Sequence, residues 1–321
     1  MQQGGIRVKL LAAGVLIALL GGALLLGREP SQPQQDYVLV IEERAQPAAQ
    51  TVAVKTDGSV AELPLDEYLT GVVMAECLPS FSAETLKAQA VAARTFAEKT
   101  AQSHKHADAD VCADPACCQA YENPAALREK LGAAYEAYRE KAASAVRDTA
   151  GQTLRYGGEL IDAVYFSCSG GRSEPAAAVW GGDVPYLRSV ESPGEEDCGK
   201  FEGRFAFSLY EFRGRLQAAD PSAVFSVLPQ DWFGKITRSD GGGVLTAQLG
   251  GAEFTGTQLR SLFSLPSTNM SFAVEGGDVV ITTRGYGHRV GMSQYGAEAM
   301  ARSGADYRAI LQHYYTGVEI K

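Results

Sequence analysis

Glu76 is the residue whose position most clearly indicates acid–base chemistry. It ends a predicted helix over residues 64–76 and lies four residues after Val72, so it continues the apolar face of that helix. Desolvation and the negative end of the helix dipole both raise the pKa of a carboxyl group placed there. A general acid that works near neutral pH requires such a raised pKa. The alternative is a buried salt bridge between Glu76 and Arg94, which the residue types alone favour.

No second acid lies near Glu76 in a position that suggests a catalytic pair. Asp66 and Glu67 belong to earlier turns of the same predicted helix, and Glu84 begins the next one. A glycosidase with two carboxylates would have to bring the partner from elsewhere in the chain. The sequence therefore offers one carboxyl group for chemistry.

A histidine and two cysteines form the spacing H-x5-C-x5-C at His106, Cys112 and Cys118, with His104 and Cys117 as spare ligands. Imidazole and thiolate together suit Zn²⁺, and three protein ligands leave a fourth position for water or a carboxylate. Disulfide pairing or free thiols explain the same residues equally well.

Two further cysteines, Cys168 and Cys198, stand 30 residues apart in loop-like contexts. A disulfide between them and two unrelated buried thiols are both consistent with the sequence.

Two glycine-rich segments, SCSGGR at residues 167–172 and GYGHRVGMSQYGA at residues 285–297, carry polar side chains. Glycine lets backbone amides approach a ligand closely, whereas tight turns between strands are the alternative. The candidate ligand-binding residues in these segments are Ser167, Ser169, Gly170, Gly171, His288, Ser293, Gln294 and Tyr295.

The elements that must position these residues alternate between helix and strand. Apolar spacing and capping residues predict helices over residues 64–76, 82–99, 125–147, 294–302 and 306–314. Short strands are predicted over residues 36–42, 51–55, 153–156, 161–166, 243–249 and 279–283. The fold class is therefore mixed α+β, with an open substrate groove, and residues 201–264 form a subdomain or insertion without an interpretable motif.

Charge excludes several classes of partner. The chain of 321 residues has 29 basic and 38 acidic side chains, and only three of the basic ones lie in the first 28 residues, which contain no acid. The remainder thus carries a net charge of −12, from 26 basic and 38 acidic residues. Such a surface argues against nucleic-acid binding and against adhesion to anionic lipid.

The N-terminus predicts export with a membrane anchor. Residues 10–27 contain no charge, and Arg7 and Lys9 precede them, so the N-terminus is expected in the cytoplasm. A cleaved signal peptide is the alternative, but no A-x-A site follows Leu26. We expect a cytoplasmic stub and transmembrane helix over residues 1–28, a Pro/Gln linker over 29–35 and a catalytic ectodomain over 36–321.

Five motifs in one order resemble the stage II sporulation protein D family. They are GVVMAECLPSFSAETLKAQAVAARTFA (71–97), CQAY (118–121), YFSCSGG (165–171), VWGG..PYL (179–187) and GYGHRVGMSQYGA (285–297). The resemblance implies a membrane-anchored lytic transglycosylase that cuts peptide-stripped peptidoglycan between N-acetylmuramic acid (MurNAc) and N-acetylglucosamine (GlcNAc) during engulfment.

The resemblance also implies roles for particular residues. Glu76 matches the family's catalytic glutamate and Arg94 its functional arginine, while Tyr186 and Arg188 match a Tyr-x-Lys pair in which arginine replaces lysine. Clostridial members carry a zinc site with the spacing of His106, Cys112 and Cys118, so zinc is expected as a structural cofactor.

The implied partners are peptidoglycan glycan strands, a sporulation amidase, the membrane scaffold of the engulfment complex and, through the N-terminal helix, the membrane. The expected location is the mother-cell membrane, with the catalytic domain facing the septal space. In the implied mechanism, Glu76 acts as acid and then as base while the sugar's own 6-hydroxyl closes a 1,6-anhydro ring. A zinc-dependent amidase and a non-catalytic glycan-binding scaffold are the alternatives.

Overall fold

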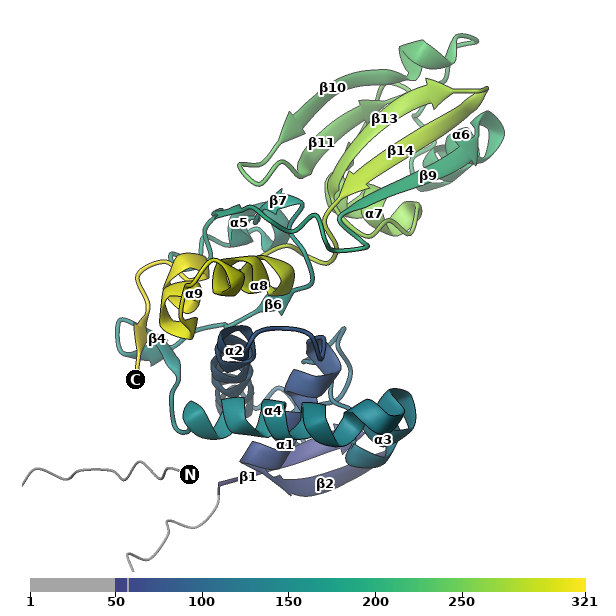
Figure 1. The fold of residues 1–321 in the computed structure, drawn as a ribbon. Helices are drawn as coiled ribbons and strands as arrows, with labels where there is room; N and C mark the ends of the chain where they lie inside the picture. The colour runs from purple at the N-terminus through teal and green to yellow at the C-terminus, as the bar shows by residue number, and fades with distance from the viewer. Residues whose placement is uncertain (1–49, 57) are drawn as a thin grey trace, which may run out of the picture. The chain divides into compact units, whose positions relative to one another are not determined.

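The computed structural model describes residues 50–56 and 58–321, which fall in one compact unit, Ala48–Lys321 (Figure 1). The predicted strand over residues 36–42 and the predicted membrane span over residues 10–27 lie outside the described residues. Among the residues that are described, no helix is both long enough and apolar enough to cross a membrane.

The first part of the described chain is a helical layer beside a small sheet. Its elements are β1 (Thr51–Thr56), β2 (Ser59–Pro64), α1 (Leu65–Glu76), α2 (Ala83–Gln102), β3 (Val111–Cys112), α3 (Pro124–Leu131), η1 (Gly132–Ala134) and α4 (Tyr135–Asp148). The helices predicted over residues 64–76 and 82–99 are confirmed. The single helix predicted over 125–147 is wrong, because Gly132 takes φ +53° and ends α3.

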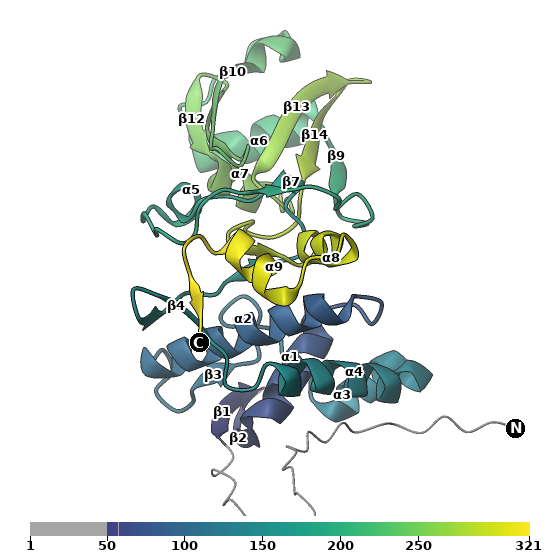
Figure 2. The same cartoon turned by 60° about the vertical axis from the view of Figure 1, so that its left-hand side comes forward.

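Helix α2 lies between two hydrophobic cores. Ala90, Ala93 and Ala97 pack into the core that contains α1 and α4, whereas Val91 and Ala92 pack into the core of the C-terminal helices. Figures 1 and 2 show α2 with α4 on one side and α8 and α9 on the other. Small side chains on both faces let neighbouring elements approach closely, which explains why α2 is rich in alanine.

The second layer consists of short strands and the last helices. Its elements are β4 (Leu154–Tyr156), β5 (Glu159–Leu160), β6 (Tyr165–Phe166), β7 (Gly171–Arg172), α5 (Ala176–Trp180), β8 (Glu191–Ser192), β15 (Met292–Ser293), α8 (Gln294–Arg302), α9 (Tyr307–Tyr314) and β16 (Glu319–Ile320). Strands β6 and β15 pair in parallel, which places Tyr165 opposite Met292. The strand predicted over residues 161–166 forms only at its end, because the amide of Asp162 bonds the Tyr186 hydroxyl instead of a strand.

A β-rich subdomain with its own core stands between these segments. It contains β9 (Glu202–Ser208), α6 (Leu209–Ala219), η2 (Pro229–Trp232), β10 (Phe233–Arg238), β11 (Val244–Leu249), β12 (Ala252–Thr255), α7 (Gly256–Leu262), β13 (Asn269–Glu275) and β14 (Asp278–Arg284). The strands form two antiparallel sheets, β10-β11-β12 and β13-β14-β9. Residues 201–264 supply most of this subdomain, and β13 and β14 complete it by pairing with β9.

A buried ion pair connects the subdomain to the layer below it. Arg289 and Glu174 are joined at 3.0 Å with side chains 0% and 1% exposed. Arg289 also donates to the carbonyls of Ser169 and Gly241, and Glu174 accepts from the amide of Gly243. A Cβ atom at Gly243 would collide with the Glu174 carboxylate, so only glycine allows this approach.

Replacing Glu174 with alanine should lower the free energy of unfolding by about 3–5 kcal/mol, because it leaves the Arg289 charge buried without its partner. Urea denaturation of the purified protein measures this change. Arg147→Ala is the matched control, since Arg147 pairs with Glu140 on an exposed surface. Equal effects of the two substitutions would contradict the role of the buried pair.

Candidate active site

Glu76 ends α1 with both carboxylate oxygens hydrogen-bonded. The backbone amide of Ala120 donates to Oε1 at 2.9 Å, and the side-chain amide of Gln294 donates to Oε2 at 3.0 Å. Burial raises the pKa of Glu76 above its usual value, and this effect outweighs the two hydrogen bonds, which lower it. Three segments far apart in the sequence therefore meet at one carboxyl group.

The salt bridge between Glu76 and Arg94 is not formed. The buried guanidinium of Arg94 donates to the carbonyls of Val146 at 3.2 Å, in the last turn of α4, and of Thr149 at 2.7 Å, at its C-cap. A cation at the negative end of a helix satisfies carbonyls that have no partner within the helix. Arg94 thus holds α4 against α2, and its functional role implied by the resemblance has no contact with Glu76 to support it.

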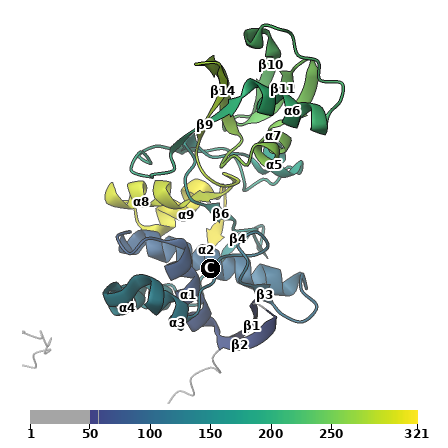
Figure 3. The ribbon, with the colours of Figure 1, turned by 90° about the vertical axis from the view of Figure 1, so that its right-hand side faces the viewer.

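Glu76 opens into a pocket of about 290 Å³. Its walls come from α1, α2, the segment after Cys112, β6, the loop before β15 and the start of α8, and Figure 3 shows β6 above α2. Of the lining residues, Glu76 is the one carboxylic acid, and aromatic rings supply much of the wall. The lining residues are Glu76, Phe96, Pro115, Cys118, Gln119, Val164, Tyr165, Phe166, Ser167, Tyr286, Gly287, His288 and Gln294.

Three of the predicted ligand-binding residues, Ser167, His288 and Gln294, line this pocket. His288 is fixed as a neutral ring: Nδ1 accepts from the amide of Val290 at 3.1 Å, and the ring also bonds the backbone of Tyr165. Burial, with a smaller contribution from the charge of Arg260, lowers the pKa of His288 to about 4. A ring held in this way shapes the wall but is a poor proton carrier at neutral pH.

The other hydrogen-bond donors of the two glycine-rich segments surround the buried carboxylate of Glu195 instead of lining the pocket. Glu195 accepts from the amide and hydroxyl of Ser169, from the amide of Gly170 and from the hydroxyl of Ser293. The amide of Gly171 donates to the Ser169 hydroxyl at 3.0 Å. These groups hold the two loops together, so their donors are not free for the substrate binding that the sequence predicts.

Three further predicted residues lie outside the pocket lining. The Tyr186 hydroxyl bonds the Asp162 carboxylate at 3.0 Å, and Arg188 is exposed with its Nε donating to Pro185. The Tyr295 ring packs edge-on against Phe81, with 5.2 Å between ring centroids. Each therefore has a structural partner, and none lines the pocket of Glu76.

Gln119 is a site residue that the sequence analysis did not single out. Its carbonyl accepts from the Tyr165 hydroxyl at 2.9 Å, and its amide donates to the Tyr68 hydroxyl at 2.9 Å. It thereby connects α1, the segment after Cys118 and β6 at the floor of the pocket. The sequence signal for Gln119 is its position in the CQAY motif, directly after the expected metal ligand Cys118.

Four potential metal ligands converge beside the pocket. The ligand atoms of His106, Cys112, Cys117 and Cys118 all lie within 4.8 Å of one another, and His106 Nε2 stands 3.2 Å from the Cys118 sulfur. Ligand atoms in a tetrahedral zinc site lie roughly 4 Å apart, so the four residues fit such an ion. Cys117, expected only as a spare, completes the set, whereas His104 does not belong to it.

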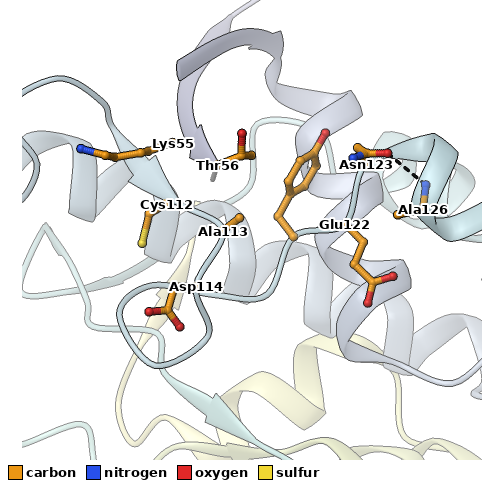
Figure 4. Close-up of a pocket in the computed structure, with 9 residues that line it drawn as sticks. Lys55, Thr56, Cys112, Ala113, Asp114, Glu122, Asn123 and Ala126 are labelled. Carbon is orange, nitrogen blue, oxygen red and sulfur yellow. Dashed lines mark hydrogen bonds between the residues drawn. The ribbon is translucent and has the colours of Figure 1, made fainter. Parts of the chain in front are cut away.

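The metal cluster contributes to two pockets. Cys118 lines the pocket of Glu76, and Cys112 lines a second pocket of about 550 Å³, whose lining residues are drawn in Figure 4. In that second pocket Lys55, Asp114 and Glu122 are the charged lining residues, and Lys55 is already paired with Asp108 at 2.9 Å. The geometry of Glu76 is therefore the stronger basis for chemistry.

Cys168 and Cys198 are neighbours in space. Both thiols are buried and free, and they hydrogen-bond to each other. The loop that carries Cys198 is attached to the segment after Cys168 through Glu195. The structure thus brings together the two residues that the sequence could pair.

Comparison with known proteins gives consistent matches. A family model described as stage II sporulation protein matches residues 49–156, which include Glu76 and the metal cluster. Stage II sporulation protein D of Bacillus amyloliquefaciens is 37% identical over 281 residues, covering 85% of this chain and 79% of that protein. The protein of the same name from Bacillus subtilis (strain 168) is 36% identical, covering 86% and 80%. An amidase enhancer of Bacillus subtilis is 26% identical, covering 78% of this chain and 40% of that protein.

The chain should bind one metal ion through all four clustered side chains. Cys117→Ser should reduce the bound metal and lower the melting temperature, because it removes one ligand of a tetrahedral site. Elemental analysis and thermal unfolding measure the two effects. His104→Asn is the control, since His104 lies outside the cluster and asparagine tolerates its φ of 50°. Full metal content in Cys117→Ser would exclude Cys117 as a ligand.

Proposed function

The chain belongs to the stage II sporulation protein D family, and from this premise we propose that it is a lytic transglycosylase of peptidoglycan. Its substrate is the glycan strand stripped of stem peptides, which it cuts between MurNAc and GlcNAc. The product carries a 1,6-anhydro ring on MurNAc.

The observation that carries this proposal is the single half-buried carboxyl group of Glu76 at the wall of an aromatic-lined pocket. A hydrolase that uses two carboxylates needs a second acid several ångströms away. None is present among the residues that line this pocket. An intramolecular nucleophile removes that need, because the substrate then supplies the attacking oxygen itself.

Glu76 first donates its proton to the glycosidic oxygen, and the bond from that oxygen to C1 of MurNAc breaks. The 6-hydroxyl oxygen of the same sugar then bonds to C1, and the Glu76 carboxylate accepts the hydroxyl proton. No water is consumed, and Glu76 ends the cycle protonated. The Ala120 and Gln294 amides stabilise the carboxylate between the two proton transfers.

The aromatic residues of the pocket suit a sugar substrate. Tyr165, Phe166 and Tyr286 line the pocket, and the exposed ring of Trp180 lies 5.3 Å from the His288 ring. Apolar ring faces pack against the C–H faces of pyranoses, while the Ser167 side chain offers a hydroxyl group to the sugar.

We assign zinc a structural role in this proposal. His106, Cys112, Cys117 and Cys118 would hold the ion with four protein ligands, which leaves no open position for a catalytic water. This favours a transglycosylase over a zinc-dependent amidase. These ligands would help to position Glu76, because Cys118 lies two residues before Ala120, whose amide donates to the Glu76 carboxylate.

The proposal also includes the location and partners. Residues 10–27 would anchor the protein in the mother-cell membrane, with the catalytic region facing the septal space. A sporulation amidase would supply the peptide-stripped glycan, and a membrane scaffold of the engulfment complex would hold the two together. The reaction that must precede this one is therefore the removal of stem peptides from the glycan.

Glu76→Gln should reduce the turnover of peptide-free glycan strands by at least about a hundredfold, because it removes the proton that the reaction transfers. Mass spectrometry of the digest should show anhydro products for the wild-type protein and their loss in the variant. Glu67→Gln, an exposed substitution on the same helix, is the control and should keep full activity. Retained activity in Glu76→Gln would contradict the proposal.

Activity should fall as pH rises through the pKa of Glu76, because the reaction starts from its protonated form. Tyr165, whose pKa burial raises well above its usual value, and neutral His288 keep their charge states over this range. Gln294→Leu removes a hydrogen bond that lowers the pKa of Glu76, so the alkaline limb of kcat/KM should move to higher pH. A limb that stays in place or moves to lower pH would contradict this assignment.

A further inference from the structure

Lys200 and Tyr286 form an exposed cation–π pair at the pocket of Glu76. The ammonium nitrogen of Lys200 lies 4.0 Å from the centroid of the Tyr286 ring. Tyr286 itself lines the pocket and is 39% exposed, and Lys200 is exposed. Contact between two solvent-exposed groups contributes little to folding, so this arrangement remains available to a ligand.

Arg260 of α7 brings a second positive charge to the neighbourhood of this pocket, although it is not one of the lining residues. Its Nε donates to the carbonyl of Leu265 at 3.3 Å, which fixes the half-buried side chain. The carbonyl of the next residue, Pro266, accepts from the amide of the pocket residue Gly287 at 3.0 Å, and the charge of Arg260 contributes to the lowered pKa of His288. The end of the β-rich subdomain that carries α7 lies next to β7 and α5 in Figures 1 and 2.

Neither cation has a carboxylate partner among the described residues, although acidic side chains outnumber basic ones in the chain by 38 to 29. The other arginines near the glycine-rich loops are already engaged. Arg172 contacts Ser189 and Glu191, and Arg289 is buried against Glu174. Two unpaired cations beside an aromatic face in an acidic protein indicate that an anion binds there.

We propose that Lys200 and Arg260 bind the lactyl carboxylate of MurNAc and so select glycan that has lost its stem peptides. This inference rests on the proposed function and deepens it. In intact peptidoglycan that carboxyl group is bound in an amide to the first amino acid of the stem peptide and has no charge. Removal of the peptide exposes a carboxylate, which a cationic wall recognises by charge-assisted hydrogen bonds.

The test compares two forms of the same peptide-free glycan strands: one with free lactyl carboxylates and one in which methylamine has converted them to neutral amides. KM and kcat are measured with the full chain in detergent for the wild-type protein, Lys200→Gln, Arg260→Gln and Arg260→Lys. Lys235→Gln is the control, because it removes an exposed lysine of β10 that, unlike Lys200, contacts no aromatic ring of the pocket. Equilibrium binding to both glycans is measured in a Glu76→Gln background, where no turnover interferes.

Lys200→Gln should raise KM for the acidic glycan about three- to fivefold and leave kcat nearly unchanged, as expected for an exposed charge pair. The same variant should show no change on the neutral glycan. Arg260→Gln should act in the same direction, and Arg260→Lys should restore part of the affinity because it keeps the charge. Thermal unfolding confirms that the Arg260 variants are folded, and Lys200 tests the proposal even if they are not.

Equal effects on the acidic and neutral glycans, or no effect of Lys200→Gln, would overturn the carboxylate assignment while leaving the transglycosylase intact. If the wild-type protein forms no anhydro product but Glu76→Gln binds acidic glycan more tightly than neutral glycan through Lys200, the proposed reaction fails and the binding assignment stands. The two failures are therefore distinguishable.

Discussion

The structure around the candidate active site depends on how Glu76 is held. Its two oxygens accept hydrogen bonds from Ala120 and Gln294, so α1, the segment after the metal cluster and the start of α8 are fixed against one another. Burial opposes the charged form of this carboxyl group, whereas the two amides favour it. That balance suits a group that must lose and regain a proton within one cycle.

Buried polar groups keep these segments in register. Glu195 joins the loop of Ser169 to Ser293, the residue before Gln294, and the pair of Arg289 and Glu174 fixes the β-rich subdomain to the same loops. Partly satisfied networks of this kind would be costly in the interior, so their near-complete hydrogen bonding specifies one arrangement. The part of the pocket wall that the second layer supplies can therefore consist of short strands and turns instead of a large sheet.

The sequence predicted the regular elements and the raised pKa of Glu76 more accurately than the roles of the loops. Apolar spacing located α1 and α2, and the residues of α8 were predicted without error, because local periodicity determines such helices. The break at Gly132 was missed because a glycine inside a helical pattern is often tolerated. The spacing of His106, Cys112 and Cys118 left a metal site and disulfides equally open, and the family resemblance favoured zinc. The structure brings these ligands together, but Cys117 could not be chosen as the fourth before the fold was known.

The roles that the sequence did not predict share one cause, which is a long-range partner without a local signature. Nothing around Glu195 indicates that it takes up the donors of Ser169 and Ser293, and nothing near Arg94 indicates that it contacts the carbonyls after α4. Polar residues in a glycine-rich loop therefore looked like ligand donors although they hold the protein together. Three-dimensional contacts decide between these roles, and the pocket retains Glu76, Gln294 and the aromatic wall.

The central claim is that the nucleophile belongs to the substrate and that no water enters the product. Digestion of peptide-free glycan strands in water enriched with heavy oxygen, followed by mass spectrometry of the products, tests it directly. The account predicts anhydro ends with no heavy oxygen at the cleaved bond. One heavy oxygen in each new reducing end would show hydrolysis and contradict it.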